Sequence, residues 1–425
     1  MNRMDGVLRK VRAEVGSLEE EIVATLRQVV RIPSVVGEEA EAQGFMEELY
    51  RKLGLQVVRV LPDLEAARQH PAFIDSGMSY RDRFNLLGLL EGDATRPSLM
   101  LNGHVDVVSP EPVRAWTHDP WGSEIAGGML YGRGAADMKA GLLANFFALK
   151  ALLQAGLKPQ GRVSLASVID EEAGGAGGTL TCLLKGFTAD AMICTEPHHL
   201  NITVAHAGVS HFRIRVRGRS IHGGLAHLGV NAIGKMYVIY QALEALDRTR
   251  GGSVRFPLFE KGSGRSCHLS VGTMKAGDWS STVAGEAEIE GRVSFVPGES
   301  LAEIKQLIEA TVLEASRKDD WLREYLPEVE WVGWQDGPWY QDPSHPFVQT
   351  FKSAAEDALG REVDFIGRAA GLDTRFAPHF GMAAACTGPR GYNIHGIDEH
   401  VELSSVFDTV SVLAATLLRW CGYDD

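Results

Sequence analysis

Positive charge is scarce in this sequence. Its 425 residues include 42 lysines and arginines against 55 aspartates and glutamates, so the formal net charge is −13 at pH 7. A protein that binds nucleic acid needs a basic face to neutralise phosphate groups. We therefore expect no nucleic-acid partner.

Long apolar stretches and paired cysteines are missing too. No stretch approaches the roughly 18 uninterrupted apolar residues of a membrane-spanning helix, and the opening Met-Asn-Arg-Met-Asp-Gly is unlike a secretory signal. The cysteines are scattered and form no Cys-x-x-Cys; they are Cys182, Cys194, Cys267, Cys386 and Cys421. This pattern argues against a disulfide framework and a thiolate zinc site. We expect a cytoplasmic globular protein with no membrane partner.

The first part of the chain alternates helical and strand patterns. Apolar spacing predicts helices at 17–31, 38–53 and 139–153, and strands at 55–60, 85–90, 98–101 and 162–169. This alternation predicts an α/β fold with a mostly parallel central sheet. Residues 61–84 are polar and irregular, and we expect a long surface excursion there, which is a candidate for carrying specificity.

A different pattern occupies residues 209–333. Its predicted order, β-α-β-β-α-β, is typical of a ferredoxin-like α+β unit with helices on one face of an antiparallel sheet. The alternating basic residues of 213–219 are expected to face solvent. The first pattern then resumes with a helix at 345–359, a strand at 383–386 and a helix at 405–418. We therefore expect one α/β domain, formed by 1–208 and 334–425, with 209–333 inserted into it.

A histidine and an aspartate follow one of the apolar strands, in the stretch Asn-Gly-His104-Val-Asp106. Side chains two residues apart on an extended chain point to the same face. A histidine that binds a metal usually gives its other N–H to a carboxylate, and Asp106 could serve as that carboxylate. Alone, the pair fits either a metal site or an ordinary polar strand end.

Further candidate ligands lie at strand ends or in glycine-rich turns of the same domain; they are Asp137, Glu171, Glu172, Glu196 and His395. The turn before Asp137 fits neither the dinucleotide fingerprint nor the Walker loop. Glu171 and Glu172 diverge, so one can bind a metal while the other transfers a proton. Each residue alone could instead cap a helix or face solvent.

Taken together, these residues predict a metal site. The carboxyl ends of strands in an α/β sheet form its ligand crevice. Imidazoles and carboxylates are ligands of zinc and of neighbouring metals in the series. Five ligands are too many for one tetrahedral zinc, but they fit two metals if one carboxylate bridges.

The sequence resembles, over nearly its whole length, the metallopeptidase family of acetylornithine deacetylase, succinyl-diaminopimelate desuccinylase, aminoacylase and glutamate carboxypeptidase. His-x-Asp, Gly-Arg-Gly-x-x-Asp-Met-Lys, Asp-Glu-Glu-x-Gly-Gly and His-Gly-x-Asp-Glu occur in the family's order. The resemblance implies that Asp137 bridges two metals and is followed by a cis peptide. It assigns His104 and Glu196 to one ion, and Glu172 and His395 to the other. Glu171 would be the general base, and Asp106 would orient His104.

The resemblance also implies roles outside this cluster. His222, in Gly-Arg-Ser-Ile-His-Gly-Gly, matches a lid histidine that stabilises the oxyanion in the partner subunit's site, so a homodimer through the inserted unit is expected. Arg292 and Arg375 could each bind a substrate carboxylate or form a structural ion pair. Asp-x-Arg-Phe around Arg375 is closer to the desuccinylases than to acetylornithine deacetylase. No role is implied for the remaining candidate histidines, which are His198, His199, His206, His227 and His400.

These residues predict hydrolysis of an amide. Two divalent ions outweigh the three carboxylates that hold them, so they can acidify a water and polarise an amide oxygen. We expect zinc, with cobalt or manganese possible, and a small N-acyl amino acid or amine carrying an acetyl, formyl or succinyl group. The alternatives are a dipeptidase or carboxypeptidase on the same scaffold, a deformylase of pyrimidine salvage, and a catalytically silent relative that only binds a ligand or partner.

Overall fold

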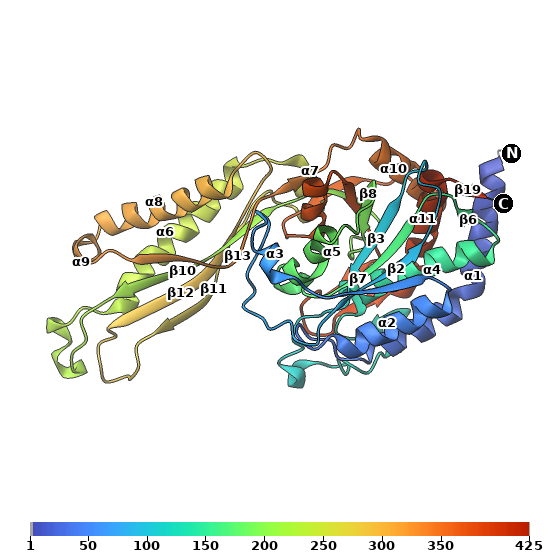
Figure 1. Ribbon diagram of the computed structural model, residues 1–425. Coiled ribbons are helices and arrows are strands. Elements are labelled where there is room, and N and C mark those ends of the chain that lie inside the picture. The colour runs from blue at the N-terminus through green and yellow to red at the C-terminus, as the bar shows by residue number, and fades with distance from the viewer. Residues whose placement is uncertain (1–2, 425) are drawn as a thin grey trace. The chain divides into compact units, whose positions relative to one another are not determined.

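The computed structural model describes residues 3–424 and divides into two units. The first contains Met1–Val204, Gln341–Phe365 and Leu372–Asp425, and the second contains Ala205–Tyr340 and Ile366–Gly371. Figure 1 labels the helices and many of the strands of both. Among the described residues, no helix has the length and apolar character needed to cross a bilayer.

A nine-stranded sheet has the order β1-β2-β7-β3-β8-β16-β9-β14, with β15 beside β9, and all of its strands except β14 lie wholly or partly within the bounds of the first unit. Its strands are β1 Gln56–Val60, β2 Asn85–Leu90, β3 Leu99–His104, β7 Val163–Val168, β8 Ala191–Cys194, β9 Ile202–His206, β14 Trp339–Tyr340, β15 Phe365–Arg368 and β16 Ala383–Cys386. The central strands β7, β3, β8 and β16 are parallel, and the pairs flanking them are antiparallel. Every residue of these four central strands is buried, as expected for parallel strands covered on both faces. The predicted α/β fold is confirmed.

Helices of the first unit are α1 Arg3–Val30, α2 Ala40–Lys52, α3 Leu64–Ala67, α4 Ala140–Gln154, α5 Thr181–Leu184, α10 Pro346–Leu359 and α11 Leu403–Cys421. Helix α4 is apolar on nearly every side because it packs against α1, α11 and β3 at once. Helix α1 begins well before residue 17, where the sequence predicts its start. The buried stripe continues upstream through Leu8, Val11 and Val15, and the Ser17 hydroxyl donates to the Glu14 carbonyl within the helix instead of capping it.

Two small sheets complete the first unit. One has the order β17-β18-β5-β4, and the other pairs β19 with β6. Their strands are β4 Ile125–Ala126, β5 Met129–Tyr131, β6 Lys158–Pro159, β17 Gly391–Tyr392, β18 His400–Glu402 and β19 Tyr423–Asp424. Strand β18 pairs with both β17 and β5. The loop that carries His395 therefore connects two strands that pair with each other.

The second unit is an antiparallel sheet covered by helices. Its strands, in the order β11-β12-β10-β13, are β11 Leu269–Ala276, β12 Glu286–Phe295, β10 Gly208–Arg217 and β13 Glu328–Asp336. Its helices are α6 Ala232–Ser253, α7 Pro257–Ser263, α8 Leu301–Arg317 and α9 Asp320–Glu324. The chain order β10-α6-β11-β12-α8-β13 and this strand order confirm the predicted ferredoxin-like unit.

Strand β10 shows why this sheet has two different faces. Phe212 and Ile214 lie in the core with α6 and α8. Arg213 and Arg215 point to the opposite face, where they bind glutamates of the adjacent strands, including Glu290 at 2.6 Å from Arg213 and Glu288 at 2.7 Å from Arg215. The alternating basic stretch is thus one side of a cross-strand ladder of ion pairs.

Candidate metal centre

Three neighbouring parallel strands bring the candidate ligands to one edge of the sheet. His104 is the last residue of β3, Glu171 and Glu172 follow β7 in the short turn Glu171–Ala173, and Glu196 follows β8. Because β3 lies between β7 and β8, all three sets end side by side. Asp137 enters from the turn before α4, and His395 from the loop between β17 and β18.

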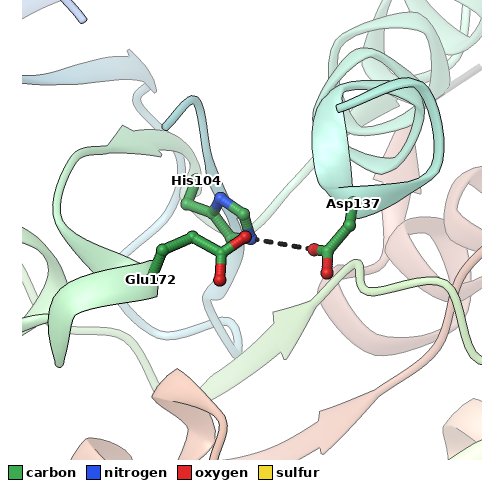
Figure 2. Close-up of side chains that lie close together, drawn as sticks. All are labelled: His104, Asp137 and Glu172. Carbon is green, nitrogen blue, oxygen red and sulfur yellow. Dashed lines mark hydrogen bonds and ion pairs between the residues drawn. The ribbon is translucent and has the colours of Figure 1, made fainter. Parts of the chain in front are cut away.

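Asp137 lies between two histidines. Its Oδ1 is 3.2 Å from Nε2 of His104, and its Oδ2 is 3.2 Å from Nε2 of His395. His395 Nε2 is also 3.1 Å from the carboxylate of Glu172. Figure 2 shows the side chains of His104, Asp137 and Glu172 pointing toward one another, and ligand atoms of these three lie within 4.8 Å of one another. The Asp137–Met138 peptide is cis, as the resemblance implies.

Two further carboxylates face His104. Glu196 Oε1 is 3.5 Å and Glu171 Oε2 is 4.0 Å from its Nε2. Both glutamates are buried. The structure therefore brings together all five residues expected to bind metal, with Glu171 beside them.

The electrostatics of this cluster suit a cation. Burial and the repulsion of neighbouring carboxylates raise the pKa of Glu171 and of Glu196 well above the usual range. Hydrogen bonds to Asp137 and Glu172 raise the pKa of His395 to about 11. Four carboxylates share the space with only two imidazoles, so ionising all four would leave an excess of negative charge even with both histidines protonated. Divalent ions would relieve that excess, and the donor set is one that zinc and its neighbours accept.

A second layer of polar contacts holds the ligands. The backbone N–H groups of Ala136 and Asp137 each donate to Glu399 at 3.0 Å, and Arg133 donates to the other oxygen of Glu399 at 2.5 Å. Arg133 also donates to the carbonyl of Gly396, next to His395. One buried ion pair thus links the loop of Asp137 to the loop of His395.

Asp106 acts through two different groups. Its main-chain carbonyl lies 2.9 Å from Nδ1 of His104, whereas its carboxylate is 3.7 Å from that nitrogen. The carboxylate accepts the backbone N–H groups of Glu172 at 3.1 Å and Glu171 at 3.4 Å. The Asp106 side chain, which was expected to orient His104, therefore holds the turn of the two glutamates, and the close contact to His104 comes from the Asp106 carbonyl.

A family model described as Peptidase family M20/M25/M40 matches residues 100–419. The chain belongs to this family. N-formyl-4-amino-5-aminomethyl-2-methylpyrimidine deformylase of Halalkalibacterium halodurans is 27% identical over 98% of this chain and 98% of its own. The enzyme of the same name from Bacillus subtilis is 30% identical, with coverages of 82% and 86%. Both names describe deacylases, so the predicted deacylase class agrees with these relatives.

Other members of the M20 family are also similar. Succinyl-diaminopimelate desuccinylase of Rhodopseudomonas palustris is 27% identical over 93% of this chain and 97% of its own. The solved structure of human carnosine dipeptidase 1 superposes with a TM-score of 0.77 at 16% identity, covering 98% of this chain and 99% of that one. The latter similarity shows a shared fold.

The two arginines expected to bind substrate lie in different surroundings. Arg375 is buried in the first unit and donates to the carbonyls of Ala72, at 3.1 Å, and Gly174. These contacts are hydrogen bonds to main-chain carbonyls that join two segments of the first unit. Arg292 lies on β12 of the second unit, exposed at the surface, and donates to the carbonyl of Ala369 at 3.1 Å.

The histidines outside the metal cluster make local contacts. His222 is exposed in the second unit, where its Nδ1 accepts the N–H of Gly224 and caps a short helical turn. The rings of His199 and His400 both pack on Tyr392. His206 stacks on Trp339.

Several residues of the site were missed by sequence reasoning. Glu399 lies in the His-Gly-x-Asp-Glu motif, so its position beside His395 was a usable signal. Asp170, which precedes Glu171, accepts the hydroxyl of the half-buried Tyr80 and lies 3.6 Å from the buried Arg83. Tyr80 and Arg83 belong to the 61–84 segment, whose irregular pattern carries no sign of such contacts.

Proposed function

We propose that the protein is a deacylase that uses two divalent metal ions to hydrolyse the amide of a small N-acyl compound. N-formyl aminomethylpyrimidines are the preferred candidate substrates. The observation that carries the proposal is Asp137, whose two oxygens face two histidines beside Glu171. The similarity to two pyrimidine deformylases, one over almost the entire chain, supports the choice of acyl group and amine.

In this proposal Asp137 would be shared by the two ions. His104 and Glu196 would hold one of them, and Glu172 and His395 would hold the other. Zinc is the first candidate, with cobalt and manganese as alternatives of the same ligand preference. Bound ions of this kind acidify a water and polarise the carbonyl of an amide.

Glu171 is the proposed general base. It would take a proton from the attacking water and deliver it to the leaving nitrogen, so the amine departs neutral. Asp106 would keep Glu171 in place through the backbone N–H groups of the turn. His222 would donate to the oxyanion that develops on the substrate carbonyl.

We propose that the second unit forms a homodimer and that His222 serves the partner's site. The support is an exposed apolar surface on the edge strand β11 and the start of α6. Ile233, Tyr237, Met274 and Trp279 expose between 47% and 67% of their surface there. An unpaired edge with apolar side chains is a ready template for a second copy. We also place the protein in the cytoplasm, as its composition predicts.

Two other activities of the same family remain as alternatives. A desuccinylase substrate carries a carboxylate that Arg292 would bind, whereas a formyl group offers none. A dipeptidase is the second alternative, in keeping with the fold shared with carnosine dipeptidase 1. A silent binding protein would have to lack the base or a ligand, and all of them are present here.

The test is to compare kcat/KM for N-formyl-4-amino-5-aminomethyl-2-methylpyrimidine, N-acetyl and N-succinyl amino acids, and dipeptides, with protein loaded with zinc, cobalt or manganese. We expect the formyl compound to be cleaved best. Glu171→Gln should lower kcat by at least about 100-fold, whereas Glu314→Gln on exposed α8 should not. Preferential cleavage of dipeptides would overturn the deformylase assignment, and an unchanged Glu171→Gln enzyme would overturn the mechanism.

A further inference from the structure

The turn that carries Glu171 and Glu172 is rich in glycine. It runs directly into Ala-Gly-Gly-Ala-Gly-Gly, which ends at Gly178. Glycines lose more backbone freedom on ordering than any other residue, so a segment so rich in them needs contacts from outside. Asp170, just before Glu171, has φ +71°, a left-handed conformation that costs free energy for a residue with a side chain.

The outside contacts to Asp170 come from the 61–84 segment. The Tyr80 hydroxyl donates to Oδ2 of Asp170 at 2.6 Å, and the N–H of Gly177 donates to the same oxygen at 3.1 Å. Nη2 of Arg83 is 3.6 Å from the other oxygen of Asp170. Arg83 is itself fixed by Glu39, which accepts from it at 2.9 Å and 2.5 Å. The Asp170 carboxylate thus connects both the start of the turn, at Asp170, and its later part, at Gly177, to Tyr80 and Arg83.

Close packing adds to these hydrogen bonds. A Cβ placed on Gly177 would lie 1.9 Å from the Tyr80 ring, so the ring rests directly on the backbone of the turn. A Cβ on Gly174 would lie 3.0 Å from Ile74. The side-chain amide of Asn85 donates to the carbonyl of Gly177 at 2.8 Å.

Arg375 extends the same set of contacts. It donates to the carbonyl of Gly174 in the turn and to that of Ala72 in the 61–84 segment. One buried side chain therefore joins the two segments at a point away from Tyr80. Residues 72–85 cover the turn over most of its length.

We propose that residues 72–85 form a clamp that positions Glu171 and Glu172, and that Tyr80 is its positioning residue. The proposal rests on the proposed function, because it concerns the base and a metal ligand of that site. Tyr80 touches neither the substrate nor the reacting atoms in this scheme. It acts through Asp170, by holding the left-handed start of the turn.

The hydroxyl of Tyr80 is suited to this task. A tyrosine hydroxyl is protonated at neutral pH and can donate, and burial and the nearby Asp170 raise its pKa further. Without it, Asp170 keeps the N–H of Gly177 and the charge of Arg83, but loses its shortest hydrogen bond. The protein should still fold, and the turn should sample other conformations more often.

The test compares metal-loaded Tyr80→Phe with wild type in kcat, KM, metal content and amide hydrogen exchange. We expect kcat to fall about 5- to 20-fold with KM changed less than about twofold, because small displacements of a reacting group lower the rate of chemistry. Exchange in peptides covering 169–180 should become faster. Ser76→Ala is the matched control, since Ser76 is the other partner of the Tyr80 hydroxyl, at 3.1 Å, and its loss leaves the bond to Asp170 intact.

The outcomes separate this inference from the proposed function. If wild type cleaves no amide, the proposed function fails, and hydrogen exchange alone still decides whether Tyr80 holds the turn. Unchanged exchange and unchanged kcat in Tyr80→Phe would overturn the clamp. Asp170→Asn provides a second variant at the other end of the same bond, and it should reproduce faster exchange at 169–180.

Discussion

Oδ2 of Asp137 lies 3.2 Å from Nε2 of His395, although the two residues come from distant parts of the chain. The other oxygen of the same carboxylate faces His104 at the same distance. The Asp137 carboxylate therefore lies between the two halves of the candidate site, one with His104 and the other with His395. Its replacement should affect both halves, which no other ligand's replacement should do.

Asp137→Ala should abolish the binding of both metal ions. Wild-type protein should contain about two ions per chain and the variant close to none, because the bridging ligand contributes to both sites. Metal analysis after gel filtration measures this. Asp320→Asn, at an exposed position on α9, is the control and should retain both ions. Retention of both ions by Asp137→Ala would contradict the bridging role.

Asp106→Ala should lower kcat sharply while losing less metal than His104→Ala. The Asp106 carboxylate supports Glu171 and Glu172 through their N–H groups, whereas the His104 ring offers a ligand atom directly. We expect a fall in kcat of about 10- to 100-fold for Asp106→Ala. Equal loss of metal in the two variants would refute this division.

Arg133→Met should destabilise the fold strongly. It leaves Glu399 buried without its cationic partner, a change that typically costs about 3–5 kcal/mol. Lys318→Met breaks a solvent-exposed pair with Glu314 on α8 and should destabilise the fold far less, because water and salt screen an exposed pair. Urea denaturation of both variants, read by circular dichroism, measures the difference. Comparable losses in the two would show that the Arg133–Glu399 link contributes little.

His222→Ala should lower kcat about 100-fold or more if its imidazole stabilises the oxyanion. His227→Ala is the matched control, because it removes an exposed imidazole from the same short helical turn and should leave kcat unchanged. Equal activities in the two variants would remove His222 from the mechanism.

A mixture of two inactive variants tests whether His222 acts across a dimer. In a heterodimer of His222→Ala with Glu171→Gln, the site that keeps Glu171 would receive the intact His222 of the other chain. Activity should therefore reappear on mixing and subunit exchange. If the mixture stays as inactive as its components, His222 does not serve the partner's site.

Incubation with a zinc chelator should abolish activity and leave the fold intact. The helices and strands are held by a buried core, so circular dichroism should change little while turnover is lost. Adding back zinc, cobalt or manganese and measuring kcat identifies the metals that work. Full activity after complete metal removal would exclude the proposed chemistry.

Much of the fold was predictable because it depends on local periodicity. The apolar runs of β3 and β7, the apolar helix α4 and the alternation of β10 each follow from their own residues. The start of α1 was placed too late, since a plausible capping signature at Ser17 competes with an apolar stripe that continues through Val11 and Val15. The 61–84 segment was expected at the surface, yet Arg83 is buried against Glu39.

The sequence by itself determined the chemistry of this protein: which imidazoles and carboxylates are present, and that they stand at strand ends of one α/β domain. Only the tertiary structure decided how they meet. It placed one oxygen of Asp137 toward each histidine and gave the Asp106 carboxylate to the N–H groups of the turn. It also brought Tyr80 onto Asp170. Those contacts join residues far apart in the chain, and they depend on how strands and loops pack, which no local pattern encodes.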